Sequence, residues 1–569
     1  MTLVTPFNQP APELGNQYDD DRILRSLLMR VLGPDVLRTI EPELRDLGEL
    51  AGGSLYRWQL EDRLNDPKLT NFAPWGERID TLEVSPLWRE AERLASTRGL
   101  VATAYERKHG ELSRIHQFAL VYLFAASTDI YSCPLAMTDG AARTLSRSGN
   151  QPLIDHALPH LLSRDPKTFW TSGQWMTEAT GGSDVGTSET VAVPESDGSY
   201  RLHGRKWFTS AVGAQMIVTL ARPVGNGPGG SGLAMFYLEK HDASGRANGL
   251  VVHRLKEKLG TRKVPTAEVT LEGSRARLVT PGVTTHGTRH IVPMLSVTRT
   301  WNSVCAVAGM RRAIALARDF AKKRTAFGAP LSEKPLHLDT LATIAAEHEA
   351  AMQLTFRVIA LFGKDEAGTI TESEARLLRV LTPVVKLITG KQALVVASEA
   401  IEAFGGPGYV EDTGLPLLVR DAQVLAIWEG TTNVLSLDTL RALGKDGGME
   451  SVLAEVRRAG GTARDARLAE VARAAERAVV HAAEWLARTQ RAGSVDVVEA
   501  GARRFAMTLG RALEAALLVE QAQWSLDHEH DARATAAAVR FTRAGLDLVC
   551  EEDDRAECAA LANDTPLAS

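Results

Sequence analysis

The spacing of apolar residues changes along the chain, and this constrains the fold more than any other feature. From about residue 20 to residue 165, apolar side chains recur every three or four positions, as in amphipathic helices. Residues 170–275 instead carry short alternating or β-branched runs, at 190–193, 215–220, 233–238 and 268–271. Helical spacing returns over residues 292–443, with long segments at 304–323 and 338–362.

A glycine-rich break at residues 444–449 precedes an Ala- and Arg-rich stretch with helical spacing. We therefore predict an α+β multidomain protein, with a helical domain at 1–168, a β domain at 169–285, a helical bundle at 286–445 and an additional helical domain at 446–569. The β runs lie wholly between helical regions, which is not the alternation that builds a parallel α/β sheet. Rossmann-type binding is disfavoured, since Gly405-Gly406-Pro407-Gly408 lacks the spaced glycine fingerprint.

Composition narrows the class of protein. A chain of 569 residues with 44% apolar and 24% charged residues is typical of a soluble globular protein of several domains. No window approaches the ~18 unbroken apolar residues of a membrane span, and the N-terminus lacks a secretory pattern. The four cysteines are too scattered for a disulfide framework or a paired-thiolate zinc site. We expect a cytoplasmic protein with no metal and no membrane partner.

Two segments of the β region could hold a flat or phosphorylated ligand. Residues 175–185 are rich in small and hydroxylated side chains that expose backbone N–H groups. Residues 206–210 place Trp207 and Thr209 on one face of a strand, where a ring could be stacked and its edge bonded. The alternatives are a strand-connecting turn for the first segment and sheet core for the second.

Two charged residues of the third region are candidates for chemistry. Glu429 is flanked by Ile427, Trp428 and Gly430, so a poorly solvated carboxylate there could act as a general base. The alternative is a residue at an ordinary helix start, followed by Thr-Thr-Asn capping. Arg324 could clamp a phosphate or neutralise the carbonyl end of a helix.

Together, and in this order, six motifs resemble those of the acyl-CoA dehydrogenase family. The resemblance covers about residues 20–443 and implies that family's helical, β and helical fold. The matching segments are Met176-Thr177-Glu178 with Gly182-Ser183-Asp184-Val185, residues 207–210, Arg324 with Phe327-Gly328, residues 402–408, Arg420-Asp421-Ala422, and Trp428-Glu429-Gly430-Thr431.

The resemblance implies a bound FAD shared between subunits, and hence a homotetramer arranged as a dimer of dimers. The residues that it assigns to the cofactor within one chain are Met176, Thr177, Gly182, Ser183, Trp207, Thr209, Thr431 and Asn433. The residues that it assigns to the FAD of a neighbouring subunit are Arg324, Phe327, Gly405 and Gly406.

Glu429 matches the family's catalytic base, which removes the α-proton of an acyl thioester while a hydride passes from the β-carbon to the flavin. One branch carries the base immediately before an Arg of an earlier helix, but here Thr298 precedes Arg299. The resemblance also implies acyl-CoA as substrate and an electron-transfer flavoprotein as acceptor. It assigns substrate contacts to Ser183, Arg299 and Gly430.

Several departures from the short- and medium-chain enzymes are similar to the AidB-like branch of the family. They include the long N-terminal segment, Ser296 where a CoA-contacting Asp often lies, and the extra module after Leu443. That branch suggests an alternative function, a flavoprotein associated with DNA, with little turnover, in protection from alkylation damage. Some other relatives of this fold suggest a second alternative, a flavin that reacts with oxygen.

Charge counts bear on the DNA alternative. Residues 446–569 hold 15 Arg and no Lys against 21 acidic residues, whereas a DNA-binding domain should be basic. Residues 455–511 alone hold 11 Arg against 7 acidic residues, and the acidic surplus is densest at 551–554. A restricted arginine face or an ordinary solvated helix face both fit this pattern. The candidate arginines are Arg441, Arg457, Arg458, Arg503 and Arg504.

Overall fold

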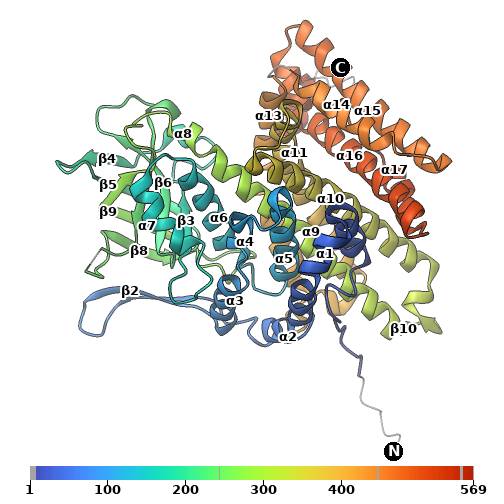
Figure 1. The fold of residues 1–569 in the computed structure, drawn as a ribbon, viewed down its shortest axis with the longest axis horizontal. Coiled ribbons are helices and arrows are strands. Elements are labelled where there is room, and N and C mark those ends of the chain that lie inside the picture. The colour runs from blue at the N-terminus through green and yellow to red at the C-terminus, as the bar shows by residue number, and fades with distance from the viewer. Residues whose placement is uncertain (1–7, 243, 445–446, 551–554, 568–569) are drawn as a thin grey trace, which may run out of the picture.

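The computed structural model describes residues 8–242, 244–444, 447–550 and 555–567. The β domain and the C-terminal helices lie at opposite sides of a central helical bundle (Figure 1). This confirms the α+β fold with an additional C-terminal helical domain. The predicted domain boundary at 445–446 and the acidic residues 551–554 lie outside the described residues.

The N-terminal region is mostly helical, as its apolar spacing predicts. Its helices are α1 (Arg22–Gly52), α2 (Ser54–Glu61), α3 (Pro86–Thr97), α4 (Ala102–Glu106), α5 (Ser113–Ala125), α6 (Ser132–Ser146) and α7 (Gln151–Leu161). The prediction of helix throughout this region is wrong at one place, where β1 (Lys68–Phe72) and β2 (Arg78–Glu83) form an antiparallel hairpin. The hairpin turns at Gly76, whose φ is 90°, and its side chains alternate in exposure as strand residues do.

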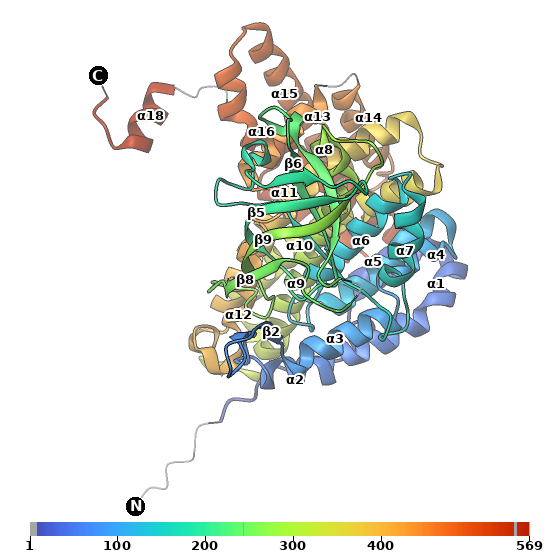
Figure 2. The same ribbon diagram turned by 90° about the vertical axis from the view of Figure 1, so that its left-hand side faces the viewer.

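A seven-stranded sheet forms the middle domain. Its strands are β3 (Ser172–Trp175), β4 (Val191–Pro194), β5 (Tyr200–Thr209), β6 (Met216–Pro223), β7 (Ala234–Glu239), β8 (Leu250–Leu255) and β9 (Ala267–Leu278). The order is β3-β6-β4-β5-β9-β7, with β8 paired to β9. The strands β4, β6, β7 and β9 overlap the four predicted runs. Figure 2 shows strands of this sheet lying side by side.

The third region is built on three long helices, α9 (Val292–Lys323), α10 (Pro335–Ala367) and α11 (Glu372–Glu402). A capping box between Thr371 and Glu374 starts α11, just after Gly368 ends α10 with a φ of 73°. Helix α11 is long and apolar enough to cross a membrane, but 83% of its apolar window is buried inside the protein, which is typical of a core helix. The smaller elements are α8 (Gly287–His290), β10 (Thr325–Ala326), β11 (Ala329–Pro330), α12 (Pro416–Val424) and α13 (Thr432–Leu443).

The C-terminal region packs on the bundle through α16, which contacts α10, α11 and α13. Its helices are α14 (Gly448–Gly460), α15 (Ala466–Arg491), α16 (Val495–His528), α17 (Arg533–Arg543) and α18 (Arg555–Asn563). Its apolar side chains share one core with α10, α11 and α13. Helix α18 stands apart from this core (Figure 2).

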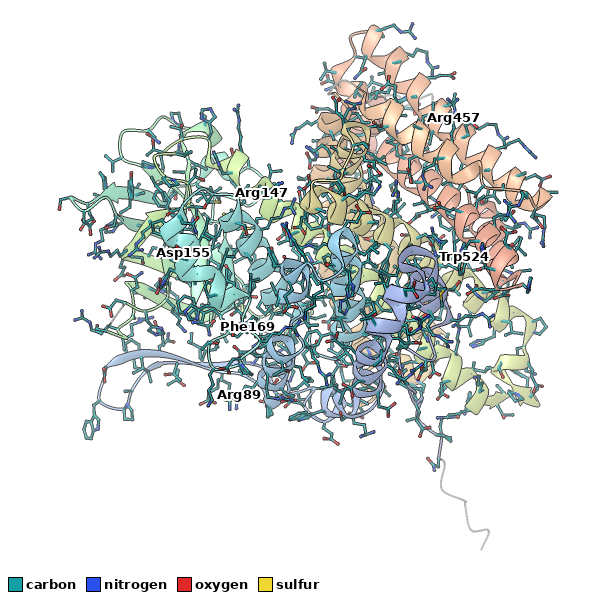
Figure 3. All side chains as sticks on the ribbon, viewed as in Figure 1. Arg89, Arg147, Asp155, Phe169, Arg457 and Trp524 are labelled. Atoms are coloured by element: carbon teal, nitrogen blue, oxygen red, sulfur yellow. The ribbon has the colours of Figure 1, made fainter. Side chains whose placement is uncertain are left out.

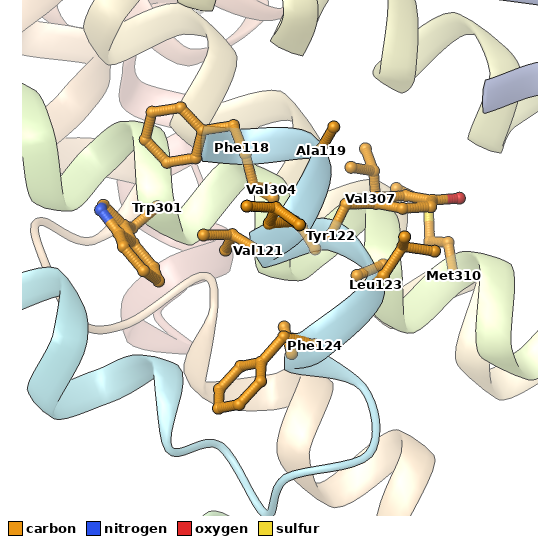
Figure 4. Close-up of a cluster of buried hydrophobic side chains, with 14 of the residues drawn as sticks. Phe118, Ala119, Val121, Tyr122, Leu123, Phe124, Trp301, Val304, Val307 and Met310 are labelled. Carbon is orange, nitrogen blue, oxygen red and sulfur yellow. The ribbon is translucent and has the colours of Figure 1, made fainter. Parts of the chain in front are cut away.

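Helix α5 is buried on every side and packs against α9. Aromatic and branched side chains of the two helices interdigitate, including Phe118, Tyr122, Trp301 and Val304 (Figure 4). A helix that is apolar all round belongs in a core. This contact fixes the position of the first turns of α9.

Asp139 of α6 ties four helices together below this apolar contact. Its fully buried carboxylate accepts hydrogen bonds from Arg114 at 2.7 Å, from Gln117 at 3.0 Å and from Trp301 at 2.8 Å. Arg114 also pairs with Glu366 of α10. Because a buried cation needs its partners, this network holds α5, α6, α9 and α10 in one arrangement.

We expect Asp139→Ala to lower the free energy of unfolding by about 3 kcal/mol or more, since it leaves the buried Arg114 short of a counter-charge. The matched control is Asp155→Ala on the surface of α7 (Figure 3), which should change stability by less than about 0.5 kcal/mol. Chemical denaturation followed by circular dichroism measures both. Equal stability of the two variants would contradict the role given to Asp139.

Candidate active site

The loop after β3 is fastened to β5 by a buried ion pair. Lys206 donates from its Nζ to Glu178 Oε1 at 2.7 Å and to the carbonyl of Leu220 at 2.9 Å. Burial alone would raise the pKa of Glu178, but Lys206 and the hydroxyl of Thr190 outweigh burial and lower it. Glu178 is therefore an anchor of the loop, a role that the sequence motif alone does not reveal.

The anchored loop presents the predicted cofactor residues at the edge of the sheet. Met176 is buried, Thr177 is half-buried and its carbonyl accepts from Trp207 N at 3.0 Å, and Gly182 and Ser183 are exposed. A Cβ on Gly182 would lie 2.7 Å from Thr177 Oγ1. Only glycine at that position leaves the Thr177 hydroxyl uncovered.

The end of β5 carries an aromatic ring and two hydroxyl groups, those of Trp207, Thr209 and Ser210. The Nζ of Lys256 lies 3.5 Å from the centroid of the Trp207 ring and covers one of its faces. Thr209 is fully buried and donates its hydroxyl to the carbonyl of Ala267 at 2.7 Å. Its proton is therefore already used, whereas Ser210 is half-buried beside Thr266.

Glu429 lies in a turn with unusual backbone geometry between α12 and α13. Its φ is 58° and that of Gly430 is 109°, conformations that side-chain-bearing residues rarely adopt. Thr298 of α9, which is buried, donates its hydroxyl to Glu429 Oε2 at 2.6 Å. This bond fixes the orientation of the carboxylate.

Two cationic side chains bond successive carbonyls of this turn. Arg299 of α9 donates from Nε to the carbonyl of Glu429 at 3.2 Å, and Lys386 of α11 donates to the carbonyl of Gly430 at 2.6 Å. Arg299 is held in turn by Asp438 at 2.7 Å. Arg299 therefore contacts the backbone of the base, on the carbonyl of Glu429. The sequence did not indicate Thr298 as a partner of Glu429, nor did it indicate Lys386 and Asp438.

Cys133 at the start of α6 connects the β domain with the base turn. Burial raises the pKa of its thiol to about 12, and the charges of Lys258 and Glu429 and the hydroxyl of Ser210 also act on it. The end of β5 and the carboxylate of Glu429 therefore both lie near the thiol of Cys133.

A cavity opens next to the base turn, with a free space of about 950 Å³ including its mouth. Trp428, which directly precedes Glu429, forms part of its wall. At Gly309 of α9 the structure leaves open space, since a Cβ there would meet no atom within 4 Å. The apolar lining includes Ile130, Cys305, Leu316, Ala393, Ala397 and Leu418.

The other predicted cofactor residues lie at the far end of α9. The rings of Phe320 and Phe404 are 4.9 Å apart, which places the β10–β11 hairpin beside the turn at Gly405 and Gly406. Phe327 at the tip of the hairpin is 98% exposed. Because α9 is one continuous helix, Arg324 lies about 39 Å from Thr298, at ~1.5 Å per residue. One chain does not bring this group to Glu429.

Thr431 and Asn433 stay close to the base turn. Both are exposed, and the hydroxyl of Thr431 caps α13 by accepting from Val434 N at 3.5 Å. The described residues contain no group of three or more His, Cys, Asp or Glu that could hold a metal ion.

Comparison with known domain families assigns most of the chain to four domains. The adaptive response protein AidB N-terminal domain matches residues 8–166, and the acyl-CoA dehydrogenase middle and C-terminal domains match residues 173–274 and 285–444. The acyl-CoA dehydrogenase 11 C-terminal domain-like family matches residues 450–566.

Two curated relatives extend over most of the chain. Acyl-CoA dehydrogenase family member 11 of Caenorhabditis elegans is 42% identical over 530 residues, 91% of this chain and 86% of the relative. The putative acyl-CoA dehydrogenase AidB of Escherichia coli is 32% identical over 463 residues, 79% of this chain and 82% of the relative.

Solved structures agree with this assignment. The structure of Caenorhabditis elegans ACDH-11 in complex with C11-CoA superposes with a TM-score of 0.91 at 39% identity, covering 99% of this chain and 97% of that one. The apo-form of Bd2924 gives a TM-score of 0.84 at 44% identity, covering 91% and 100%. The chain belongs to the acyl-CoA dehydrogenase family and carries an AidB-type N-terminal domain and an ACDH-11-type C-terminal domain.

Proposed function

We propose that this oxidoreductase dehydrogenates an acyl-CoA with FAD as its cofactor and Glu429 as the base. The observation that carries the proposal is the carboxylate of Glu429, oriented by Thr298 at 2.6 Å, beside an apolar cavity. Removal of a weakly acidic α-proton requires a positioned base in a water-poor site. The turn supplies that base, and Trp428, the residue before it, forms part of the cavity wall.

The residues at the end of the sheet fit an isoalloxazine ring and a diphosphate. The half-buried ring of Trp207 suits stacking on a flat ring, and the small residues of the 176–185 loop let a phosphate approach its backbone. When bound, FAD accepts the hydride that leaves the β-carbon. Within one chain, the residues that would hold it are Met176, Thr177, Gly182, Ser183, Trp207, Thr431 and Asn433.

A second copy of the chain would complete the cofactor site. Phe327, Gly405 and Gly406 are exposed, and Arg324 beside them is half-buried. This group is remote from Glu429 in its own chain, and an exposed group can serve a neighbouring subunit. We propose a homotetramer in which each such group reaches the FAD of its neighbour. An electron-transfer flavoprotein is the proposed acceptor.

The substrate would lie with its acyl chain in the cavity and its thioester against the turn. A cavity with a mainly apolar lining suits a flexible hydrocarbon chain. The N–H of Gly430 follows the base directly and is the donor we assign to the thioester carbonyl. The C11-CoA complex of the nematode relative supports an acyl-CoA as ligand.

The DNA-binding alternative receives less support from the geometry. Arg457 (Figure 3) pairs with Glu476 at 2.7 Å, and Arg458 pairs with both Glu455 and Glu520. Arginines that are already paired with carboxylates contribute little positive field for phosphates. We therefore propose the enzyme as the function of this chain.

The first experiment is an anaerobic titration of the FAD-loaded protein with a panel of acyl-CoA esters, followed by flavin absorbance. We expect one class of ester to bleach the flavin, and Glu429→Gln to slow bleaching at least about 100-fold because the base is lost. The control Glu399→Gln changes an exposed carboxylate of α11 and should bleach like the native protein. No bleaching of a fully loaded flavin by any ester would refute the proposal, and peroxide formed in a parallel sample in air, without anaerobic bleaching by any ester, would indicate an oxygen-reacting enzyme.

A second variant tests the place of the acyl chain. Gly309→Leu should fill the open space at the wall of the cavity and lower kcat/KM for long esters about 10- to 100-fold, at ~0.8 kcal/mol per displaced methylene, while short esters are spared. Gly227→Leu, in an exposed loop with equally open surroundings, is the control and should leave chain-length preference unchanged. A uniform loss for all esters would place the acyl chain elsewhere.

A further inference from the structure

Lys386 is a buried charged residue of the bundle to which the proposed chemistry gives no role. Its side chain is 0% exposed, in the middle of α11 and within the apolar run Val384-Val385-Lys386-Leu387-Ile388. A lysine is rarely placed in such surroundings without a partner of specific function. The nearest acceptor is the carbonyl of Gly430 at 2.6 Å, in the turn that carries Glu429.

The charged groups that act on Lys386 are few. Among the helices packed around α11, the side chains with an electrostatic effect on the ammonium are Glu429, which favours it, and Arg299, which disfavours it. Arg299 is itself balanced by Asp438. Glu429 is therefore the carboxylate that favours the ammonium form of Lys386.

Burial lowers the pKa of Lys386 to about 7, against the attraction of Glu429. The ammonium form is therefore held below pH 7 and is given up progressively above it.

We propose that Lys386 is a positioning residue for the catalytic base, because it holds the 429–430 turn through the carbonyl of Gly430. The inference rests on the proposed function of Glu429. The hydrogen bond stabilises the positive φ values of the turn and so fixes where the carboxylate of Glu429 lies.

Two variants separate the bond from the charge. Lys386→Met removes both, and Lys386→Gln keeps a donor for the carbonyl of Gly430 but removes the charge. Lys391→Met, five residues further along α11 and half-buried, is the matched control. FAD content and melting temperature establish that each protein is folded, and Lys386→Gln decides the question if Lys386→Met does not fold.

The decisive readout is the split between kcat and KM for the FAD-loaded variants with an acyl-CoA ester. We expect kcat to fall at least about 10-fold in Lys386→Met with KM little changed, because the turn then no longer holds the carboxylate in position. Part of the loss should be recovered in Lys386→Gln, which keeps a donor, and Lys391→Met should leave kcat and KM unchanged.

A crystal structure of Lys386→Met tests the same role without turnover, since residues 429–430 should then leave the positive φ values of the native turn. An unchanged turn, or a kcat equal to that of the native protein, would overturn the proposal. A failure of acyl-CoA to bleach the flavin would refute the proposed function while the structure of the turn still tests the role of Lys386.

Discussion

Two carbonyl groups in succession, those of Glu429 and Gly430, are each bonded by a buried or half-buried cation, and the rest of the site depends on this arrangement. The two cations come from two different helices, α9 and α11. A turn with two positive φ values is costly unless its surroundings fix it. Here two helices that are remote from the turn in sequence fix it, so the base is held by the bundle and not by its own segment.

The architecture delivers the other half of the site to this point. Asp139 and the apolar contact between α5 and α9 fix the first turns of α9, on which Thr298 and Arg299 lie. The ion pair of Glu178 with Lys206 fixes the loop at the end of the sheet. Helix α9 then extends away from the base, so that its far end lies about 39 Å from Thr298, at ~1.5 Å per residue. One helix thus carries the support of a base at one end and an exposed hairpin at the other.

Much of this could be predicted from the sequence because the signals are local. The runs at 190–193, 215–220, 233–238 and 268–271 are strands, and the resemblance selects Glu429 from a single motif. The β1–β2 hairpin was not predicted, since two short strands inside a helical region give a weak alternating signal. Its Gly76, at a tight turn, is the sign that could have indicated it.

The supports of the base could not be predicted in the same way. Thr298 is 131 residues from Glu429, and Lys386 is 44 residues from Gly430, so no local pattern joins them. One feature of the sequence could have indicated the contact of Lys386, namely its place as a lone lysine within an apolar helical run. Only a specific partner explains a lysine in such surroundings. Thr209 shows the opposite case, because its pattern indicates a free hydroxyl that the structure finds bonded to Ala267.

The most direct test of this account is a crystal structure of the FAD-loaded protein with an acyl-CoA whose β-carbon is replaced by sulfur, so that it binds without reacting. The account predicts the acyl chain in the cavity beside Gly309, the thioester carbonyl at the N–H of Gly430, and the α-carbon about 3–3.5 Å from the Glu429 carboxylate. An acyl chain outside this cavity, or an α-carbon beyond the reach of Glu429, would contradict it.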